Sequence, residues 1–201
     1  MSACFKAVSA ALVALSLTAC DPSANQPPVE DAPLYGSALS GDFSLVDSAG
    51  EPVSNTDFAG RYQLIYFGYA YCPNVCPFDV QRMMRGYDLY AEEHPDLAAD
   101  VQPIFITVDP ERDTPERVGE FASAFSDDLI GLTGTPEQID AVAENFFFTV
   151  QRVPPIEPGG DYDIQHPSIG YLVDREGQPM ALIPVDQSAE AVAAELAKWV
   201  R

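Results

Sequence analysis

The sequence predicts a single α/β domain. Apolar runs of strand length alternate with segments of helical periodicity, and a late pair of strands and a final helix follow them. Such alternation is typical of a sheet covered by helices. The chain has 201 residues, 47% of them hydrophobic. This length and composition suffice for one substantial core and exclude a disordered or fibrous chain.

The first predicted elements are a β-hairpin, a buried strand and a helix. Residues 42–47 and 51–53 flank a Ser48-Ala49-Gly50 turn, which favours a hairpin. Residues 63–69 form a dense aliphatic and aromatic run of strand length. An amphipathic helix is then expected over residues 78–93, where apolar side chains recur at helical spacing, namely Val80, Met83, Met84, Tyr87 and Ala91.

A second strand and two helices are expected next. Residues 101–108 predict another buried strand, in which Pro103 argues against a central hydrogen bond. Thr114 and Thr135 each precede a proline, which is the pattern of an N-cap followed by proline at the first helical position. Gln138 also occupies the capping-box position of the second helix. Two helices should therefore begin at these threonines.

The last part of the chain predicts three more strands and a closing helix. Residues 146–153, 169–173 and 179–183 have strand-like composition, and a turn at residues 174–177 joins the last two. Residues 188–200 predict an amphipathic helix whose inner side carries Val192, Leu196, Trp199 and Val200. Taken in order, these elements favour a thioredoxin-like fold with an N-terminal β-hairpin extension.

The first residues have the pattern of a secretory signal. Lys6 precedes an uncharged apolar run of 11 residues, shorter than the roughly 20 that a transmembrane helix needs. The run ends in Leu17-Thr18-Ala19-Cys20, which resembles a bacterial lipobox, where the cysteine becomes the lipidated first residue of the mature protein. The alternative is an ordinary signal peptide in which Cys20 occurs by chance.

The chain is therefore expected to have three parts. Residues 1–19 are a lipoprotein signal peptide, residues 20–38 are a lipidated Cys20 and a flexible Pro-rich tether, and residues 39–201 are the folded domain. Such a signal places the domain in the bacterial periplasm. Asp21, next to the cysteine, resembles the signal that keeps lipoproteins on the inner membrane. The lipid anchor thus makes the membrane a predicted partner.

The charge balance excludes one class of partner. Lysine and arginine number 10 against 31 aspartates and glutamates, which gives a net charge of −21. An acidic surface repels phosphate backbones, so nucleic acid is not an expected partner. Cations and partners with a basic face are favoured instead.

Cysteine usage leaves one pair to explain. Cys4 leaves with the signal and Cys20 would carry lipid, so Cys72 and Cys76 remain for the domain. Their spacing at the start of a helix can bring both sulfurs to one side, where helix amides are expected to lower the thiol pKa. Three alternatives stay open: soft thiolates for Cu(I), or for Cu(II) with an imidazole; a dithiol that exchanges with disulfides; or a structural disulfide.

The chain has only two histidines that could complete a metal site. His94 lies at the end of the predicted helix over residues 78–93, where a solvent-exposed role is expected, and it is left out of the site. His166 lies in a loop before the strand at residues 169–173. A thioredoxin-like topology brings that loop beside the one before the first helix, which makes His166 a candidate ligand.

Four aspartates near these loops have two interpretations each. Asp109 and Asp113 could orient the metal-binding loop, but a cap and turn role at the end of the second buried strand is the simpler interpretation. Asp161 and Asp163 could guide a cation towards His166. The simpler interpretation is that both are solvated residues of the loop. None of the four is predicted to be a ligand.

Four segments of the domain, in order, match one family. They are Phe67-Gly68-Tyr69 with Cys72-Pro73-Asn74-Val75-Cys76-Pro77, then Val108-Asp109-Pro110-Glu111-Arg112-Asp113-Thr114-Pro115, then His166, then Tyr171-Leu172-Val173-Asp174. Together they resemble the Sco/SenC proteins. The usual family pattern has Asp where this chain has Asn74, and Asp-His followed by Ser or Thr where it has Gln165-His166-Pro167.

The resemblance implies both a ligand set and a role. It implies copper as the bound metal, with Cys72, Cys76 and His166 as its ligands. The implied role is a periplasmic, membrane-anchored metallochaperone that delivers copper to the binuclear copper centre of cytochrome c oxidase. Its implied partners are the copper-bearing oxidase subunit and other periplasmic copper chaperones. We expect an exposed site in loops outside the apolar core, from which copper passes by ligand exchange.

Two other functions use the same cysteines. A thiol-disulfide oxidoreductase would keep the cysteines of the acceptor site reduced through Cys72 and Cys76, without needing His166. A peroxiredoxin-like peroxidase is disfavoured, because the Cys-Pro-x-x-Cys-Pro loop lacks the Thr-x-x-Cys arrangement of such enzymes. A metallochaperone without catalytic turnover is therefore favoured over an enzyme.

Overall fold

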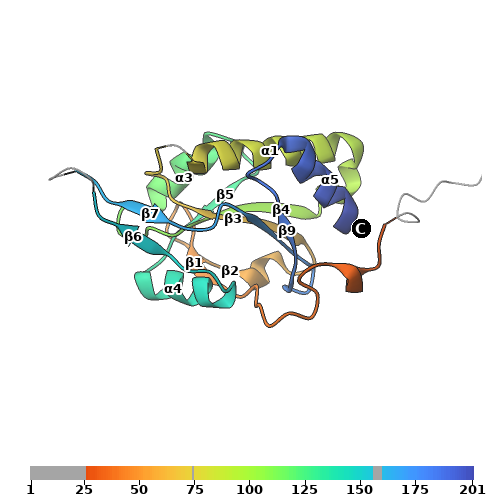
Figure 1. The fold of residues 1–201 in the computed structure, drawn as a ribbon, viewed down its shortest axis with the longest axis horizontal. Helices are drawn as coiled ribbons and strands as arrows, with labels where there is room; N and C mark the ends of the chain where they lie inside the picture. The colour runs from red at the N-terminus through yellow and green to blue at the C-terminus, as the bar shows by residue number, and fades with distance from the viewer. Residues whose placement is uncertain (1–25, 74, 156–159) are drawn as a thin grey trace, which may run out of the picture.

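A five-stranded mixed sheet forms the centre of the protein. The computed structural model describes residues 26–73, 75–155 and 160–201. The strand order is β5-β4-β3-β8-β9, with β3, β4 and β5 parallel and β8 and β9 antiparallel to their neighbours (Figure 1). This is the predicted thioredoxin-like arrangement. The strands are β3 (Tyr62–Gly68), β4 (Val101–Thr107), β5 (Ile130–Leu132), β8 (Gly170–Val173) and β9 (Pro179–Ile183).

Helices cover both faces of the sheet. On one face α1 (Val75–Glu93) packs against α5 (Ala189–Trp199), and α4 (Pro136–Asn145) lies on the opposite face near the β1–β2 hairpin (Figure 1). Every residue of β3 and β4 is buried, as strands covered on both faces require. The remaining named elements include α2 (Pro95–Ala98), α3 (Pro115–Ser123), β1 (Ser44–Val46), β2 (Pro52–Ser54) and the short 3₁₀ turns η2 (Val29–Asp31) and η3 (Asn55–Phe58).

The predicted helix starts are confirmed by their capping contacts. The Thr114 hydroxyl accepts from the backbone N–H of Arg117 at the start of α3. Thr135 and Gln138 form a reciprocal capping box at the start of α4. Each threonine is followed by a proline in the first turn, where a missing N–H costs no helical hydrogen bond. The local sequence alone therefore fixes where these two helices begin.

Pro103 lies inside the sheet without breaking it. Its strand, β4, is flanked by β3 and β5, and Pro103 stands opposite Leu64 of β3. Pairing with β5 begins one residue later, at Ile104. The absent N–H of Pro103 therefore removes no hydrogen bond from the paired part of the β4–β5 ladder.

The prediction of a strand over residues 146–153 is wrong for its first part. The helix α4 ends at Asn145, and the chain then turns through Phe147, which has a φ of 53°. This turn buries Phe146 and Phe148 but exposes Phe147, an alternation that imitates a strand. Only β6 (Gln151–Val153) is extended, and it pairs with β7 (Asp163–Gln165) in a separate two-stranded ribbon.

The first long helix begins earlier than the expected Phe78. It starts at Val75 and contains Cys76 and Pro77 in its first turn. Proline is tolerated there because the first N–H groups of a helix have no partner within the helix. Cys76 is consequently a helical residue packed into the core, not a loop residue outside it.

Part of the expected tether packs on the domain. The Gln26 side-chain amide donates to the carbonyls of Ala197 and Val200 at the end of α5, at 2.7 and 2.9 Å. Further along, Ala32 is buried and the Leu34 N–H donates to the Met180 carbonyl of β9. Residues 26–38 are thus held to the domain by hydrogen bonds and apolar contacts, contrary to a flexible tether.

The predicted signal peptide and Cys20 lie outside the described residues. Among the helices of the described part of the chain, none combines the length and the apolar character that crossing a bilayer requires. The lipidation of Cys20 and the cleavage before it stay predictions.

Close packing of α1 on α5 at Gly86 gives a stability test. A Cβ atom on Gly86 would lie 2.5 Å from Val192 Cβ and 2.7 Å from the Ala189 carbonyl oxygen. We expect Gly86→Ala to lower the free energy of unfolding by about 1–3 kcal/mol in urea denaturation, despite the better helix propensity of alanine. Asp88→Ala, at an exposed position of α1, is the control and should change it by less than about 0.5 kcal/mol. Unchanged stability of Gly86→Ala would contradict the packing.

Candidate metal centre

Two of the predicted ligands are in direct contact. The Cys76 Sγ atom lies 3.3 Å from His166 Nε2, although the residues are 90 positions apart. The backbone N–H of Cys76 donates to Cys72 Sγ, also at 3.3 Å. In the described ranges, no set of three or more His, Cys, Asp or Glu side chains already has the arrangement of a metal centre. The structure thus brings the three residues together without closing them around one point.

A glycine permits this approach. Gly68 ends β3, and a Cβ atom there would meet Tyr66 Cε1 at 2.7 Å and Cys76 Sγ at 3.3 Å. The first of these distances is a clash, so any larger residue at position 68 would displace the Tyr66 ring, which packs beside the Cys76 side chain. The motif glycine before the cysteine loop is therefore a packing requirement of the site.

The backbone selects which imidazole nitrogen of His166 faces the sulfur. Nδ1 lies 3.0 Å from the carbonyl oxygen of Pro167, which can only accept a hydrogen bond. Nδ1 therefore carries the proton, and the Nε2 lone pair faces Cys76. Burial lowers the pKa of His166, so the neutral form is favoured. The rings of Tyr66 and Tyr69 stand edge-on to the imidazole, at 6.2 and 5.8 Å between centroids.

The Cys76 thiol does not match the expected electrostatics. The pKa of Cys76 is raised, first by its hydrogen bond with the Cys72 side chain and then by burial. The expected lowering of the pKa by helix amides is therefore wrong for Cys76. The hydrogen bond with Cys72 and desolvation by burial together favour the neutral thiol. Both cysteines are thiols here, not a disulfide.

The site is less exposed than expected. Cys76 is fully buried and Cys72 is 8% exposed. A cavity of about 290 Å³ reaches the site from one side, and its lining includes Cys72, Val75, Asp163 and His166 but not Cys76. Cys72 and His166 therefore border the opening, while Cys76 lies behind them.

Asp79 connects the cysteine and histidine segments, a role that the sequence analysis missed. This carboxylate on α1 is 2% exposed and accepts from the Tyr66 hydroxyl at 3.0 Å and from the Ser168 hydroxyl. Arg82 forms a 3.1 Å ion pair with it. Ser168 lies two residues after His166, so Asp79 holds the histidine loop against α1. The available signal was an acidic residue one turn after Cys76, beside the apolar stripe of the helix.

Asp113 does more than the expected cap and turn role. It is fully buried and accepts from the Ala70 backbone N–H at 2.7 Å and from the Thr107 hydroxyl at 2.6 Å. Burial raises the pKa of Asp113. It thereby ties the cysteine loop to the end of β4, which is the orienting role that had been the less favoured alternative. The cap of α3 is Thr114.

The other predicted polar residues divide between the site and the surface. Asp109 accepts from the Tyr162 hydroxyl at 2.7 Å and pairs with Arg112. Asp163 accepts from the Tyr69 hydroxyl, so it is not merely solvated, whereas Asp161 is exposed. His94 lies outside the site as expected, but it is half-buried against the Tyr90 ring, at 5.0 Å between centroids, and not solvent-exposed as predicted. Residue 74 is not described.

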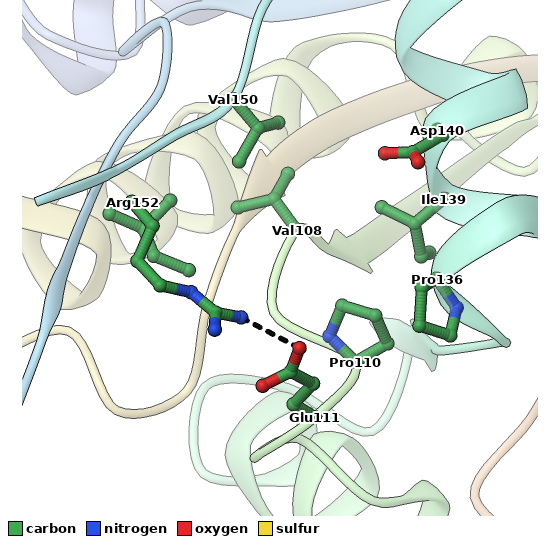
Figure 2. A pocket seen from close by; sticks show the side chains of 9 residues that line it. Val108, Pro110, Glu111, Pro136, Ile139, Asp140, Val150 and Arg152 are labelled. Atoms are coloured by element: carbon green, nitrogen blue, oxygen red, sulfur yellow. Dashed lines mark ion pairs between the residues drawn. The ribbon is translucent and has the colours of Figure 1, made fainter.

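A second cavity lies beyond the site. It measures about 240 Å³ and lies between the segment after β4, α4 and β6; Figure 2 shows Glu111 and Arg152 paired across it, at 2.9 Å. None of the three predicted ligands lines it. Ile164 borders both cavities, so the two are neighbours separated by the β6–β7 ribbon.

Comparison with known families identifies the chain. The SCO1/SenC family matches residues 31–201. The chain belongs to the SCO1/SenC family. It is 37% identical over 148 residues to the mitochondrial protein SCO2 of Saccharomyces cerevisiae, covering 72% of this chain and 47% of that protein. The chain spans about half the length of the curated relatives it matches.

Solved Sco structures support both the fold and the choice of metal. Arabidopsis thaliana ScoI with copper bound has a TM-score of 0.73 at 31% identity, over 81% of this chain and 98% of that one. Bradyrhizobium japonicum ScoI with copper bound has a TM-score of 0.67 at 34% identity, over 81% and 100%. The predicted family and thioredoxin-like fold are confirmed, and these structural neighbours of the Sco domain hold copper.

Burial of His166 predicts how the stability of the metal-free Sco domain depends on pH. Its folded pKa lies below the ordinary value of 6.5, so between the two values the unfolded chain binds more protons. The contribution is fully present above 6.5 and is lost as the pH falls towards the folded pKa. We expect acidification to lower the free energy of unfolding more steeply in wild type than in His166→Gln, by about 1.4 kcal/mol per pKa unit. Urea unfolding with a chelator, at several pH values, measures both; equal slopes would contradict the assignment.

Proposed function

We propose that this Sco protein is a periplasmic, membrane-anchored metallochaperone that delivers copper to the binuclear centre of cytochrome c oxidase. The supporting observation is the 3.3 Å contact of Cys76 Sγ with His166 Nε2, with Cys72 Sγ against the Cys76 amide. Likeness to two copper-bound Sco structures supports the metal. The proposed acceptor is the copper-bearing oxidase subunit, with other periplasmic copper chaperones as donors.

The donor set fits copper. Two thiolates select Cu(I), and a neutral imidazole added to them can also hold Cu(II). His166 needs no deprotonation, because burial lowers its pKa and Pro167 already binds the Nδ1 proton. Cys76 must release a proton, since its hydrogen bond with Cys72 and its burial raise the pKa of its thiol. A metal ion supplies the positive charge that makes this loss favourable, so binding releases protons.

The placement of the ligands suits transfer by ligand exchange. Cys72 and His166 border the cavity, whereas Cys76 lies behind them. Ligands of an acceptor can therefore approach copper on the side of Cys72 and His166, while Cys76 retains it from the core. No chemical turnover is needed. The net charge of −21 favours an acceptor with a basic face.

A thiol-disulfide oxidoreductase is the second candidate. The side-chain hydrogen bond between Cys72 and Cys76 favours it, because an attacking and a resolving sulfur must lie close together. Cys72 borders the cavity, which makes it the accessible thiol. This function has no need for His166, so the histidine separates the two candidates.

Single replacements of the three ligands test the chaperone. Cys72→Ser, Cys76→Ser and His166→Ala should each lower copper affinity at least ~10-fold and impair oxidase maturation, because each removes one donor. Bound copper per protein and oxidase activity in cells measure both. His94→Ala, a histidine outside the site, is the matched control.

The thermal midpoint of each variant accompanies these measurements, because Cys76 is buried in the core. If His166→Ala retained copper and normal oxidase activity while both cysteine variants lost activity, the oxidoreductase would replace the chaperone.

The proposed membrane anchor has its own test. Cys20→Ser removes the thiol that would carry the lipid, so the protein should appear in the soluble fraction or remain unprocessed. Fractionation and the mass of the mature chain measure this. Wild type recovered without lipid from the soluble periplasm would reject the anchor, and would leave the copper proposal standing.

A further inference from the structure

Arg112 lies between the two loops that carry the proposed ligands. It belongs to the segment after β4, and its side chain is only 17% exposed. Its Nη1 donates to the backbone carbonyl of Tyr162 at 2.9 Å, and its Nε pairs with the Asp109 carboxylate. The guanidinium is thereby fixed by two hydrogen bonds at different atoms of its planar fork.

The guanidinium also contacts aromatic rings from both loops. It lies 3.7 Å from the Tyr162 ring centroid, 5.3 Å from Tyr71 and 5.6 Å from Tyr69. Tyr71 immediately precedes Cys72, and Tyr162 precedes His166 by four residues. Each of these separations is within the range of a cation–π contact. One cation therefore bridges the segment of Cys72 and the segment of His166.

Asp109, the ion-pair partner of Arg112, is itself held by hydrogen bonds. Asp109 is 1% exposed, its N–H donates to the Thr107 hydroxyl, and its second carboxylate oxygen accepts from the Tyr162 hydroxyl at 2.7 Å. Tyr162 is thus held by its ring, its hydroxyl and its carbonyl. Movement of the histidine loop away from the cysteine loop would break contacts at Arg112 and Asp109 together.

We infer that Arg112 is a positioning residue that sets the separation of the Cys72–Cys76 loop from the His166 loop, and thereby the copper affinity. This inference rests on the proposed copper-binding function. A guanidinium has no lone pair to offer a metal at neutral pH, so Arg112 acts only through the residues it holds. Outer contacts of this kind typically change metal affinity 10–100-fold.

Two neighbouring arginines serve as matched controls. Arg117 lies 5.0 Å from the Tyr71 ring, and Arg152 lies 4.2 Å from the Tyr162 ring. Each stacks on a ring of one loop only, and their side chains are 44% and 51% exposed. They carry the same charge in the same region. If only positive charge near the site mattered, all three arginines would contribute similarly.

The experiment compares Arg112→Gln and Arg112→Lys with Arg117→Gln and Arg152→Gln. Copper affinity is measured by chelator competition, the Cu(II) site by its thiolate absorption and electron paramagnetic resonance spectrum, and loop order by hydrogen exchange of the metal-free protein. Arg112→Gln should weaken copper ~10–100-fold, alter the spectrum, and speed exchange at both residues 69–72 and 162–166. Arg112→Lys should show the same three changes, because lysine keeps the charge but lacks the planar guanidinium group.

The controls should stay within about fivefold of wild-type affinity, with an unchanged spectrum. Wild-type copper binding in Arg112→Gln, full rescue by Arg112→Lys, or equal effects in the controls would each overturn the inference. Should Arg112→Gln not fold, Tyr71→Leu at a half-exposed position removes one side of the bridge, and unchanged affinity there would overturn it. Wild type that binds no copper would refute the proposed function instead, and exchange at both loops would still decide the role of Arg112.

Discussion

Antiparallel pairing of β3 with β8 determines where the candidate metal centre can form. Tyr66, near the end of β3, lies opposite Gly170 at the start of β8. The chain therefore leaves β3 towards Cys72 and enters β8 from His166 at one edge of the sheet. The first turn of α1 then carries Cys76 back over that edge, within 3.3 Å of the imidazole. This register is what brings Cys76 and His166, 90 positions apart in the sequence, into contact.

Buried carboxylates hold the loops that this edge brings together. Asp79, Asp109 and Asp113 are each almost completely removed from solvent. A buried carboxylate is costly unless it is hydrogen-bonded, and each of these accepts from donors on other segments. Each carboxylate therefore requires its donors in fixed positions, because moving either loop would leave an acidic group buried without them. The cost of burying the carboxylates therefore becomes a restraint on the geometry of the site.

Burial also divides the roles of the three proposed ligands. The neutral forms of both residues are favoured, Cys76 by its hydrogen bond with Cys72 and by burial, and His166 by burial. The consequences for metal binding are opposite. A neutral imidazole is ready to coordinate, whereas a neutral thiol must first lose its proton. Under the proposed function, copper binding is therefore coupled to proton loss at Cys76, while Cys72 borders the opening.

The sequence by itself determined most of the elements and the residue types of the candidate ligands. Apolar periodicity located the sheet and the helices, and Thr114 and Thr135 marked two helix starts, because capping depends on neighbouring residues alone. The sequence-based prediction failed at residues 146–148, where a turn after α4 buries alternate phenylalanines. It also failed at residues 26–38, whose packing partners lie on β9 and α5. Local pattern carries no information about such distant partners.

Only the tertiary structure decided the environment of the site. The chemistry of the cysteines and the histidine could be predicted from residue type. The burial of Cys76, the contact of His166 Nδ1 with Pro167 and the hydrogen bonds of Asp79 could not. Arg112 likewise stands in an ordinary turn of the sequence. Its contacts with both loops exist because β3 and β4 end beside the start of β8 in the sheet. The pKa of a thiol and the tautomer of an imidazole depend on surrounding atoms, which the chain supplies only once it is folded.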